Sequence, residues 1–291
     1  MIRKILKGLA IFIGVIVVLA VGFYTKVYFS TRSRMNHTYA ITPQKISIST
    51  DSSVLALGKH YVETKGCQDC HGADLGGKIF VDDPALGLLV ARNLTKGNGG
   101  LPKDHNVDDW VLALKHGIRR NGKPLLFMPS HEYTHLSEGD MSAIISYCLT
   151  LKPVDRELPQ SNLGFLARIL TDLGKLPLLP VEMIDHDRTL IKEVKAEVTA
   201  DYGKYLSISC IGCHRENLKG GEPVAPGYPV VADISSTGNP GRWTVEQFMN
   251  TLRTGETPEG KKLDPSQMPW TMTKGYTDTE LKALFTYLRS I

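Results

Sequence analysis

The chain has 291 residues, enough for about two domains, and its 42% hydrophobic and 22% charged residues are typical of a folded globular protein rather than a disordered one. Residues 1–35 contain six basic residues and no acidic one, which leaves 28 basic against 30 acidic side chains in the rest of the chain. The net charge of +4 therefore belongs to the N-terminal segment. The composition does not support a basic nucleic-acid-binding surface on a folded domain, and we expect no nucleic-acid partner.

The chain begins with a basic start, followed by the uncharged run Leu9–Tyr24. This run is longer than the 7–15-residue core of most secretory signals and slightly shorter than a spanning helix, and the residues on either side can extend it. We expect residues 1–30 to form an uncleaved membrane anchor, with a cleaved signal ending near Ala20-Val21-Gly22 as the alternative. Both interpretations place the remaining chain outside the cytoplasm. The basic tip favours a single pass through the inner membrane, with the soluble domains on the periplasmic or outer side.

Two motifs of the type C-x-x-C-H lie 143 residues apart, Cys67-Gln68-Asp69-Cys70-His71 and Cys210-Ile211-Gly212-Cys213-His214. This pattern is typical of c-type haem attachment, because two thiols on one turn can bond to two vinyl groups of a porphyrin while the next histidine binds the iron. A zinc site would require the two cysteine pairs to converge, and a redox pair would be expected within a βαβ pattern. We therefore expect two covalently bound haem c groups, attached at Cys67, Cys70, Cys210 and Cys213, with His71 and His214 as iron ligands.

The sequence repeats itself: Gly58-Lys59 aligns with Gly203-Lys204, Val107–Gly117 with Val245–Gly255, and Met128-Pro129 with Met268-Pro269. We predict two homologous, mainly α-helical domains at residues 50–152 and 199–291. Four capping patterns predict helix starts, at Asn106, Ser137, Thr244 and Thr277. The glycine- and proline-rich stretches between each haem motif and the middle helix of its domain are expected to be loops.

Residues 153–198 join the two halves and contain several prolines. Leucines at helical spacing, Leu163, Leu166, Leu170 and Leu173, predict a short helix. We expect this helix to lie in the groove between the domains; a position on the bilayer surface is the alternative.

Each iron needs a second ligand, and a methionine would suit electron transfer because it raises the potential. Met128 and Met268 occupy matching positions before the last helix of each half, and each is followed by proline. Met272 competes with Met268, and His116, His131 and His135 are alternatives in the first half. His131 and His135 also form an H-E-x-x-H pattern, which is predicted to lie in a loop and therefore does not favour a zinc protease. The fifth cysteine, Cys148, lies on an apolar helix face and is expected to be a buried, inert thiol.

Each half resembles the class I cytochrome c domain in three features: C-x-x-C-H near the start, Met-Pro near the end, and a glycine of the first helix facing the last helix. These glycines are Gly58, facing Ile144 and Tyr147, and Gly203, facing Leu284 and Tyr287. The order Arg92-Asn93-Leu94-Thr95, Trp110, His116-Gly117, Gly122-Lys123, Met128-Pro129 is similar to the cytochrome subunits of membrane-bound alcohol and aldehyde dehydrogenases, which often carry three haem domains where this chain has two. The resemblance implies a helical shell around one haem edge, and carbonyl groups of Pro84 and Pro226 as acceptors for the two histidine rings.

We therefore expect a membrane-anchored electron carrier, not an enzyme, that works with a dehydrogenase or a respiratory complex. A di-haem peroxidase is the alternative. It would need one iron with an open sixth position, which matching Met-Pro pairs disfavour. A role mainly in assembly or gas sensing is a third hypothesis, and carbon monoxide binding to the reduced form would indicate sensing.

Overall fold

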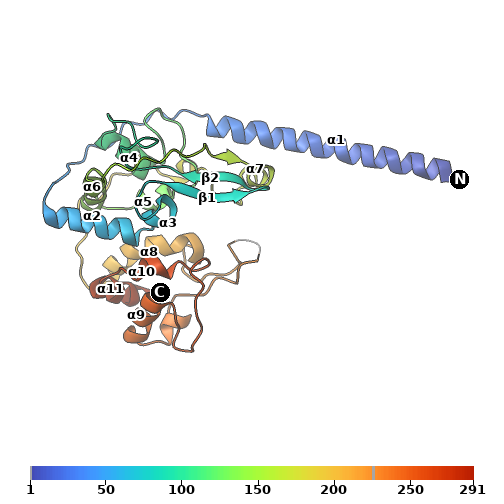
Figure 1. Cartoon of the computed structure of the whole chain (residues 1–291). Helices are drawn as coiled ribbons and strands as arrows, with labels where there is room; N and C mark the ends of the chain where they lie inside the picture. The colour runs from blue at the N-terminus through green and yellow to red at the C-terminus, as the bar shows by residue number, and fades with distance from the viewer. Residues whose placement is uncertain (1, 225–226) are drawn as a thin grey trace.

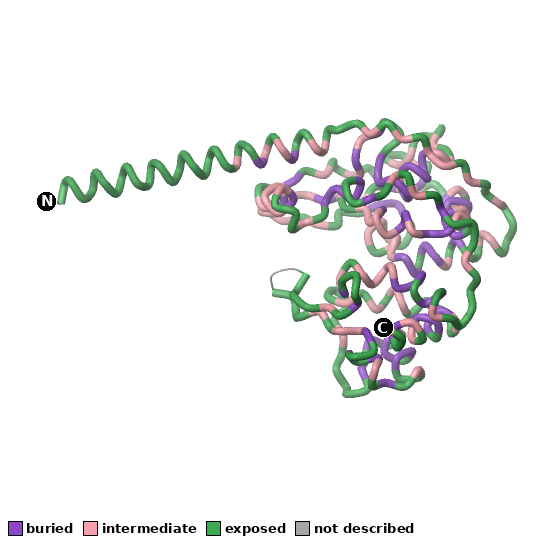
Figure 2. Tube along the Cα trace, turned by 180° about the vertical axis from the view of Figure 1, so that it is seen from behind, coloured by how far each residue is buried: buried purple, intermediate pink, exposed green. Residues whose placement is uncertain are grey.

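The computed structural model describes residues 2–224 and 227–291. The chain is mainly α-helical, as predicted, with two helical lobes and one long N-terminal helix that projects from them (Figure 1). This helix, α1 (Ile2–Met35), contains the predicted uncharged run, and none of its most apolar 18 residues is buried. Figure 2 shows this part of α1 exposed along its whole length. Such a helix is long and apolar enough to cross a membrane.

The two lobes are built on the same plan. The first helix of each lobe crosses the last, α2 against α6 in the first lobe and α8 against α11 in the second. A glycine permits each crossing, because a Cβ atom at Gly58 or Gly203 would lie 2.0 Å from the carbonyl oxygen of Ala143 or Ala283. The helices of the first lobe are α2 (Ser52–Thr64), α3 (Cys67–His71), α4 (Val107–His116), α5 (Ser130–Tyr133) and α6 (Glu138–Cys148). Those of the second are α8 (Ala200–His214), the 3-10 turn η2 (Asn239–Gly241), α9 (Val245–Thr254), α10 (Trp270–Thr273) and α11 (Asp278–Leu288).

The four predicted helix starts are confirmed. Asn106, Thr244 and Thr277 each form a reciprocal capping box at the start of α4, α9 and α11. Ser137 caps α6 through its side chain only, by accepting a hydrogen bond from the backbone of Asp140. The backbone amide of Ser137 instead donates to the hydroxyl of Tyr205, a residue of the second lobe, at 3.0 Å.

The prediction of loops after the haem motifs is wrong in the first lobe. Strands β1 (Lys78–Asp83) and β2 (Gly87–Ala91) form an antiparallel hairpin with an irregularity between Ile79 and Val81. A third strand, β3 (Asn162–Leu163), comes from the linker and pairs with β2. The alternation of apolar residues in this segment is too irregular to stand out in the sequence, and part of the pairing depends on a strand about 70 residues away.

The linker helix was predicted correctly, but its expected place between the lobes was wrong. Helix α7 (Phe165–Asp172) packs against α1, and its buried Ala167 joins Leu89 and Leu163 of the sheet and Leu178 of the linker in a small apolar cluster. The following 3-10 turn η1 (Pro180–Met183) contacts α5. The linker therefore wraps around the first lobe.

The lobes meet directly, and one hydrophobic core runs through both of them. Polar pairs flank this core at matching repeat positions. His60 on α2 pairs with Glu280 on α11 at 2.8 Å, and Tyr205 on α8 donates to the carboxylate of Asp140 on α6. The interface is therefore approximately two-fold symmetric, with each first helix reaching the start of the other lobe's last helix.

Candidate functional site

The two C-x-x-C-H motifs lie on helices that differ in one respect. Cys67 follows Gly58 by nine positions, whereas Cys210 follows Gly203 by seven. In the second lobe the motif continues α8 without a break. In the first lobe the two additional residues, Lys65 and Gly66, interrupt the helix, and Gly66 adopts a left-handed conformation with φ of 74°. The additional turn brings Lys65 into the interface between the lobes.

Both motif histidines are held by a backbone carbonyl. Nδ1 of His71 lies 2.7 Å from the carbonyl oxygen of Arg92, and Nδ1 of His214 lies 2.8 Å from that of Ala232. A ring that donates from Nδ1 keeps Nε2 unprotonated and available to a metal. Burial lowers the pKa of both imidazoles, which favours the neutral form that binds iron.

The acceptor predicted for His71, Pro84, was wrong. Pro84 lies in the turn between β1 and β2, and the hairpin returns the chain to His71 only at Arg92. Pro226, predicted for His214, lies outside the described residues, and the acceptor there is Ala232. The two acceptors, Arg92 and Ala232, occupy matching positions. Two residues after each of them, a backbone amide donates to a leucine carbonyl, from Leu94 to Leu75 in the first lobe and from Ile234 to Leu218 in the second.

None of the five cysteines forms a disulfide. Burial raises the pKa of Cys67 and of Cys210 to about 12, and it also raises the pKa of Cys70 and Cys213. The pKa of Cys148 is raised by burial as well, and its side chain packs in the core on α6, as expected for an inert thiol.

Met128 and Met268 occupy the same type of turn. The following prolines have nearly identical conformations, with φ and ψ of −76° and 51° at Pro129 and −75° and 58° at Pro269. In both turns the methionine carbonyl accepts a hydrogen bond from the residue after the proline at 2.7 Å. Both methionines are partly buried against the core. Met272 is placed differently, because its sulfur lies 3.0 Å from the position of a Cβ atom on Gly66 of the first lobe.

The other histidines considered as ligands have their own surroundings. His116 is buried at the end of α4 and faces His186, with 3.1 Å between the Nδ1 atoms. His131 lies on α5 and His135 beyond it, and Nδ1 of His135 contacts Arg188. Because α5 is a single turn, the two histidines of the H-E-x-x-H pattern do not share a helix face, and no group of three metal-binding side chains occurs in the described chain. Among the described residues, the buried Nε2 atom of His116 and the buried Nδ1 atom of His131 have no hydrogen-bond partner.

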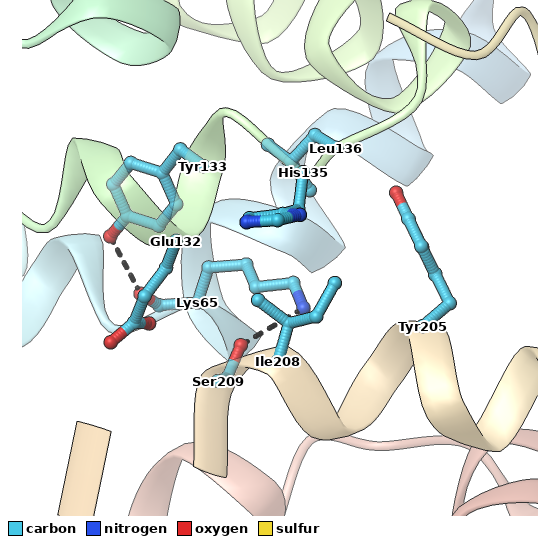
Figure 3. A pocket seen from close by; sticks show the side chains of 8 residues that line it. All are labelled: Lys65, Glu132, Tyr133, His135, Leu136, Tyr205, Ile208 and Ser209. Atoms are coloured by element: carbon cyan, nitrogen blue, oxygen red, sulfur yellow. Dashed lines mark hydrogen bonds between the residues drawn. The ribbon is translucent and has the colours of Figure 1, made fainter. Parts of the chain in front are cut away.

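A polar pocket between the lobes was missed in the sequence (Figure 3). The Lys65 ammonium donates to the Ser209 hydroxyl at 3.1 Å, and the Tyr133 hydroxyl donates to the Lys65 carbonyl at 3.0 Å. Burial raises the pKa of Glu132 to about 7, although the Lys65 ammonium opposes this shift. The Glu132 carboxylate also approaches the second motif, 3.0 Å from the position of a Cβ atom on Gly212. The unequal spacing before the two motifs was the only sequence signal for this pocket.

The donor set in each lobe fits a covalently bound haem c. Each lobe has two cysteines on one turn that form no disulfide, an imidazole fixed by a carbonyl, and a thioether in an equivalent turn. The pocket residues connect the two motifs, since Lys65 precedes Cys67 and Glu132 contacts the turn that holds Cys210 and Cys213. The two candidate haem sites therefore adjoin the same interface.

The cytochrome c family model matches residues 55–152 and 200–291. The chain is similar to the cytochrome subunit of fructose dehydrogenase from Gluconobacter japonicus, with 25% identity over 258 residues, which are 81% of this chain and 52% of that protein. It also resembles a subunit of nicotinate dehydrogenase from Pseudomonas putida, 23% identical over 74% of this chain and 19% of that protein. The cytochrome c subunit of gluconate 2-dehydrogenase from Pantoea cypripedii is 30% identical over 33% of this chain and 23% of that protein. The chain thus spans about half, or less, of the length of these relatives.

Proposed function

The chain belongs to the cytochrome c family, and from this premise we propose that it binds two haem c groups and carries electrons as the membrane-anchored cytochrome subunit of a dehydrogenase complex. The first haem would be held by Cys67, Cys70, His71 and Met128. The second would be held by Cys210, Cys213, His214 and Met268. When bound, haem c supplies one-electron redox chemistry, and an axial methionine raises its potential.

The residues of the chain attach, orient and enclose these groups. The paired thiols provide the thioether bonds. The hydrogen bonds from His71 to Arg92 and from His214 to Ala232 fix the tautomer and orientation of each ring. The Met-Pro turns would supply the sixth ligand and leave no open position for a substrate. The observation that carries the proposal is the recurrence of this set in both lobes, with equivalent acceptors for the two histidines and the same backbone geometry in the two Met-Pro turns.

The equivalent Met-Pro turns favour a carrier over a peroxidase, which needs one iron with an open or displaceable position. The common interface of the two motifs supports electron exchange between the haems within one chain. Helix α1 would anchor the protein in the inner membrane, with both lobes on the periplasmic or outer side, where covalent haem attachment and a membrane dehydrogenase would be found together.

Axial ligation is tested with Met128→Ala and Met268→Ala in the full chain. We expect each variant to lose about half of the near-infrared methionine-to-iron absorption of the oxidised protein and to lower one of two midpoint potentials. Met272→Ala is the matched control and should leave both unchanged. Full retention of the absorption band in either axial variant would identify a different ligand, such as His116 in the first lobe.

The dehydrogenase partnership is tested by isolating the tagged full chain from its native membranes in mild detergent. We expect a dehydrogenase subunit to co-purify and its substrate to reduce both haems. A chain that is isolated alone, and is reduced only by another respiratory complex, would contradict this part of the proposal.

A further inference from the structure

Helix α7 has an apolar face that the rest of the protein does not cover. Its buried side consists of Ala167 and Thr171, which pack toward the first lobe. On the other side, Phe165 and Leu173 are 54% and 55% exposed. The half-buried Ile169 lies between them at the i+4 spacing that puts all three on one stripe, which we call the α7 stripe. Two large apolar side chains are thus exposed on one side of α7, one at its first residue and one at its C-cap.

The position of α7 along α1 identifies a surface for this stripe. The Lys26 ammonium bonds to Asp172 of α7 at 2.6 Å, and Lys26 is the first charged residue after the uncharged run of α1. Arg168 of α7 donates to the Thr31 hydroxyl at 3.1 Å, and its guanidinium lies 4.8 Å from the Tyr28 ring centre. Helix α7 therefore packs where the apolar part of α1 ends.

The dimensions of α1 agree with a membrane surface at this level. The 17 helical steps from Gly8 to Thr25 rise about 26 Å, close to the roughly 30 Å hydrocarbon core of a bilayer. Tyr24, Tyr28 and Phe29 follow at the end of the apolar run, where aromatic side chains are enriched at the membrane–water boundary. Because α7 contacts α1 just beyond this length, it would lie at the level of the lipid headgroups of a bilayer that α1 spans.

The direction of α7 fits the same surface. Figure 1 shows α1 running across the view while α7, beside its C-terminal part, is seen nearly end-on. A helix that crosses the spanning helix steeply lies roughly in the plane of the membrane. The exposed Lys175, just after α7, would add attraction to anionic headgroups.

We infer that α7 is an interfacial helix whose stripe of Phe165, Ile169 and Leu173 inserts into the headgroup–acyl boundary of the bilayer that α1 crosses. Two membrane contacts, one spanning and one lying in the surface, restrict how the lobes can tilt. They would fix the orientation of the first lobe, which carries α7, relative to the membrane; Figure 1 shows the second lobe beside the first, across the direction of α1. This inference rests on the proposed membrane anchor.

The inference is tested by photolabelling. The full haem-loaded chain is reconstituted into phosphatidylcholine–phosphatidylglycerol vesicles that contain a lipid with a diazirine in its acyl chain, and labelled peptides are mapped by mass spectrometry. We expect label in α1 and in residues 165–173, and background label in α9 of the second lobe. In the variant Phe165→Ser/Leu173→Ser, labelling of residues 165–173 should fall to the level of α9 while α1 stays labelled. Leu57→Ser is the matched control, because Leu57 is an exposed leucine on α2 and its loss should change neither signal.

The outcomes separate the inference from the anchor. Label in α1 without label in α7 overturns the interfacial helix and leaves the anchor intact; the stripe would then be free for a protein partner. Label in α7 without label in α1 supports the surface contact and overturns the anchor. Label in neither overturns both. Label in α7 that survives Phe165→Ser/Leu173→Ser overturns the assignment of the stripe. Unchanged haem absorption of the variant verifies that it is folded.

Discussion

Replacing Tyr205 by phenylalanine removes one hydroxyl group that serves both lobes. This hydroxyl accepts a hydrogen bond from the Ser137 amide at 3.0 Å and donates one to the carboxylate of Asp140. In a full capping box, the Asp140 side chain would accept a hydrogen bond from the Ser137 amide. At the start of α6 the Tyr205 hydroxyl accepts this bond instead. Ser137, Asp140 and Tyr205 are all buried or nearly so. Phenylalanine retains the ring packing, so the substitution tests the hydroxyl alone.

The expected cost follows from the two broken bonds. A neutral hydrogen bond contributes about 1 kcal/mol, and one to a charged group about 1.5–3 kcal/mol. Because the Ser137 amide stays buried without this partner and the Asp140 carboxylate loses one of several hydrogen bonds, we expect Tyr205→Phe to lower the free energy of unfolding by about 2–3 kcal/mol. The loss should also loosen the contact between the lobes, since both bonds cross it.

The assay is urea unfolding of the full haem-loaded chain in detergent, followed by circular dichroism and haem absorption. Tyr287→Phe is the matched control, because the Tyr287 hydroxyl makes no side-chain hydrogen bond with any described residue. We expect the control to stay within about 0.5 kcal/mol of the unchanged protein. Equal stability of the two variants would refute the role given to Tyr205 at the interface.

Three further substitutions test other parts of the structure. His60→Gln removes the pairing with Glu280 and should lower the free energy of unfolding, measured by unfolding across pH. The loss should be largest between about pH 4.5 and 6.5, the ordinary pKa values of the two groups. The hydrogen bond to Glu280 raises the pKa of His60, so the stability that His60 contributes is complete below pH 6.5 and is lost as pH rises through the raised pKa. The pKa of Glu280 is lowered despite its burial, because His60 donates to it. The stability that Glu280 contributes is therefore lost as pH falls through the lowered pKa. A destabilisation that does not change from pH 5 to 9 would contradict this assignment. Gly203→Ala should cost about 3 kcal/mol because the methyl group meets the carbonyl of Ala283 at 2.0 Å, and a stability change below about 1 kcal/mol by the same assay would disprove the close helix crossing. Gly66→Ala should cost about 1–2 kcal/mol for its left-handed backbone, and a neutral or stabilising effect would show that the helix break before Cys67 is absent.

Much of each lobe could be predicted because its signals are local. The four capping patterns each act within one turn, and all four mark true helix starts. The repeat aligned Gly58 with Gly203, and the resemblance to class I cytochrome c domains placed both glycines against the last helix, where a side chain would collide with it. The equivalence of Met128 and Met268 also came from the repeat, although their binding to iron is still a prediction.

Features that depend on distant contacts could not be predicted. The β1–β2 hairpin is completed by β3 from the linker, and it moves the acceptor for His71 from Pro84 to Arg92. Helix α7 was recognised from its leucines, but its packing against α1 depends on Lys26, Thr31 and Arg168, polar residues without a periodic signal. The interface was hidden for the same reason, because Lys65 and Glu132 look like ordinary surface charges in the sequence. Such residues gain their role only when two segments far apart in the chain meet.

The central claim is that each lobe holds one covalently attached haem at its own C-x-x-C-H motif. Intact-mass spectrometry of the denatured chain, made in a host that attaches haem, measures this directly and is compared with Cys67→Ala/Cys70→Ala and Cys210→Ala/Cys213→Ala. We predict the mass of two haems on the unchanged chain and of one haem on each double variant, with the remaining haem mapped to the other motif. A polypeptide without added haem mass, or one that keeps both haems after either motif is removed, would contradict the account.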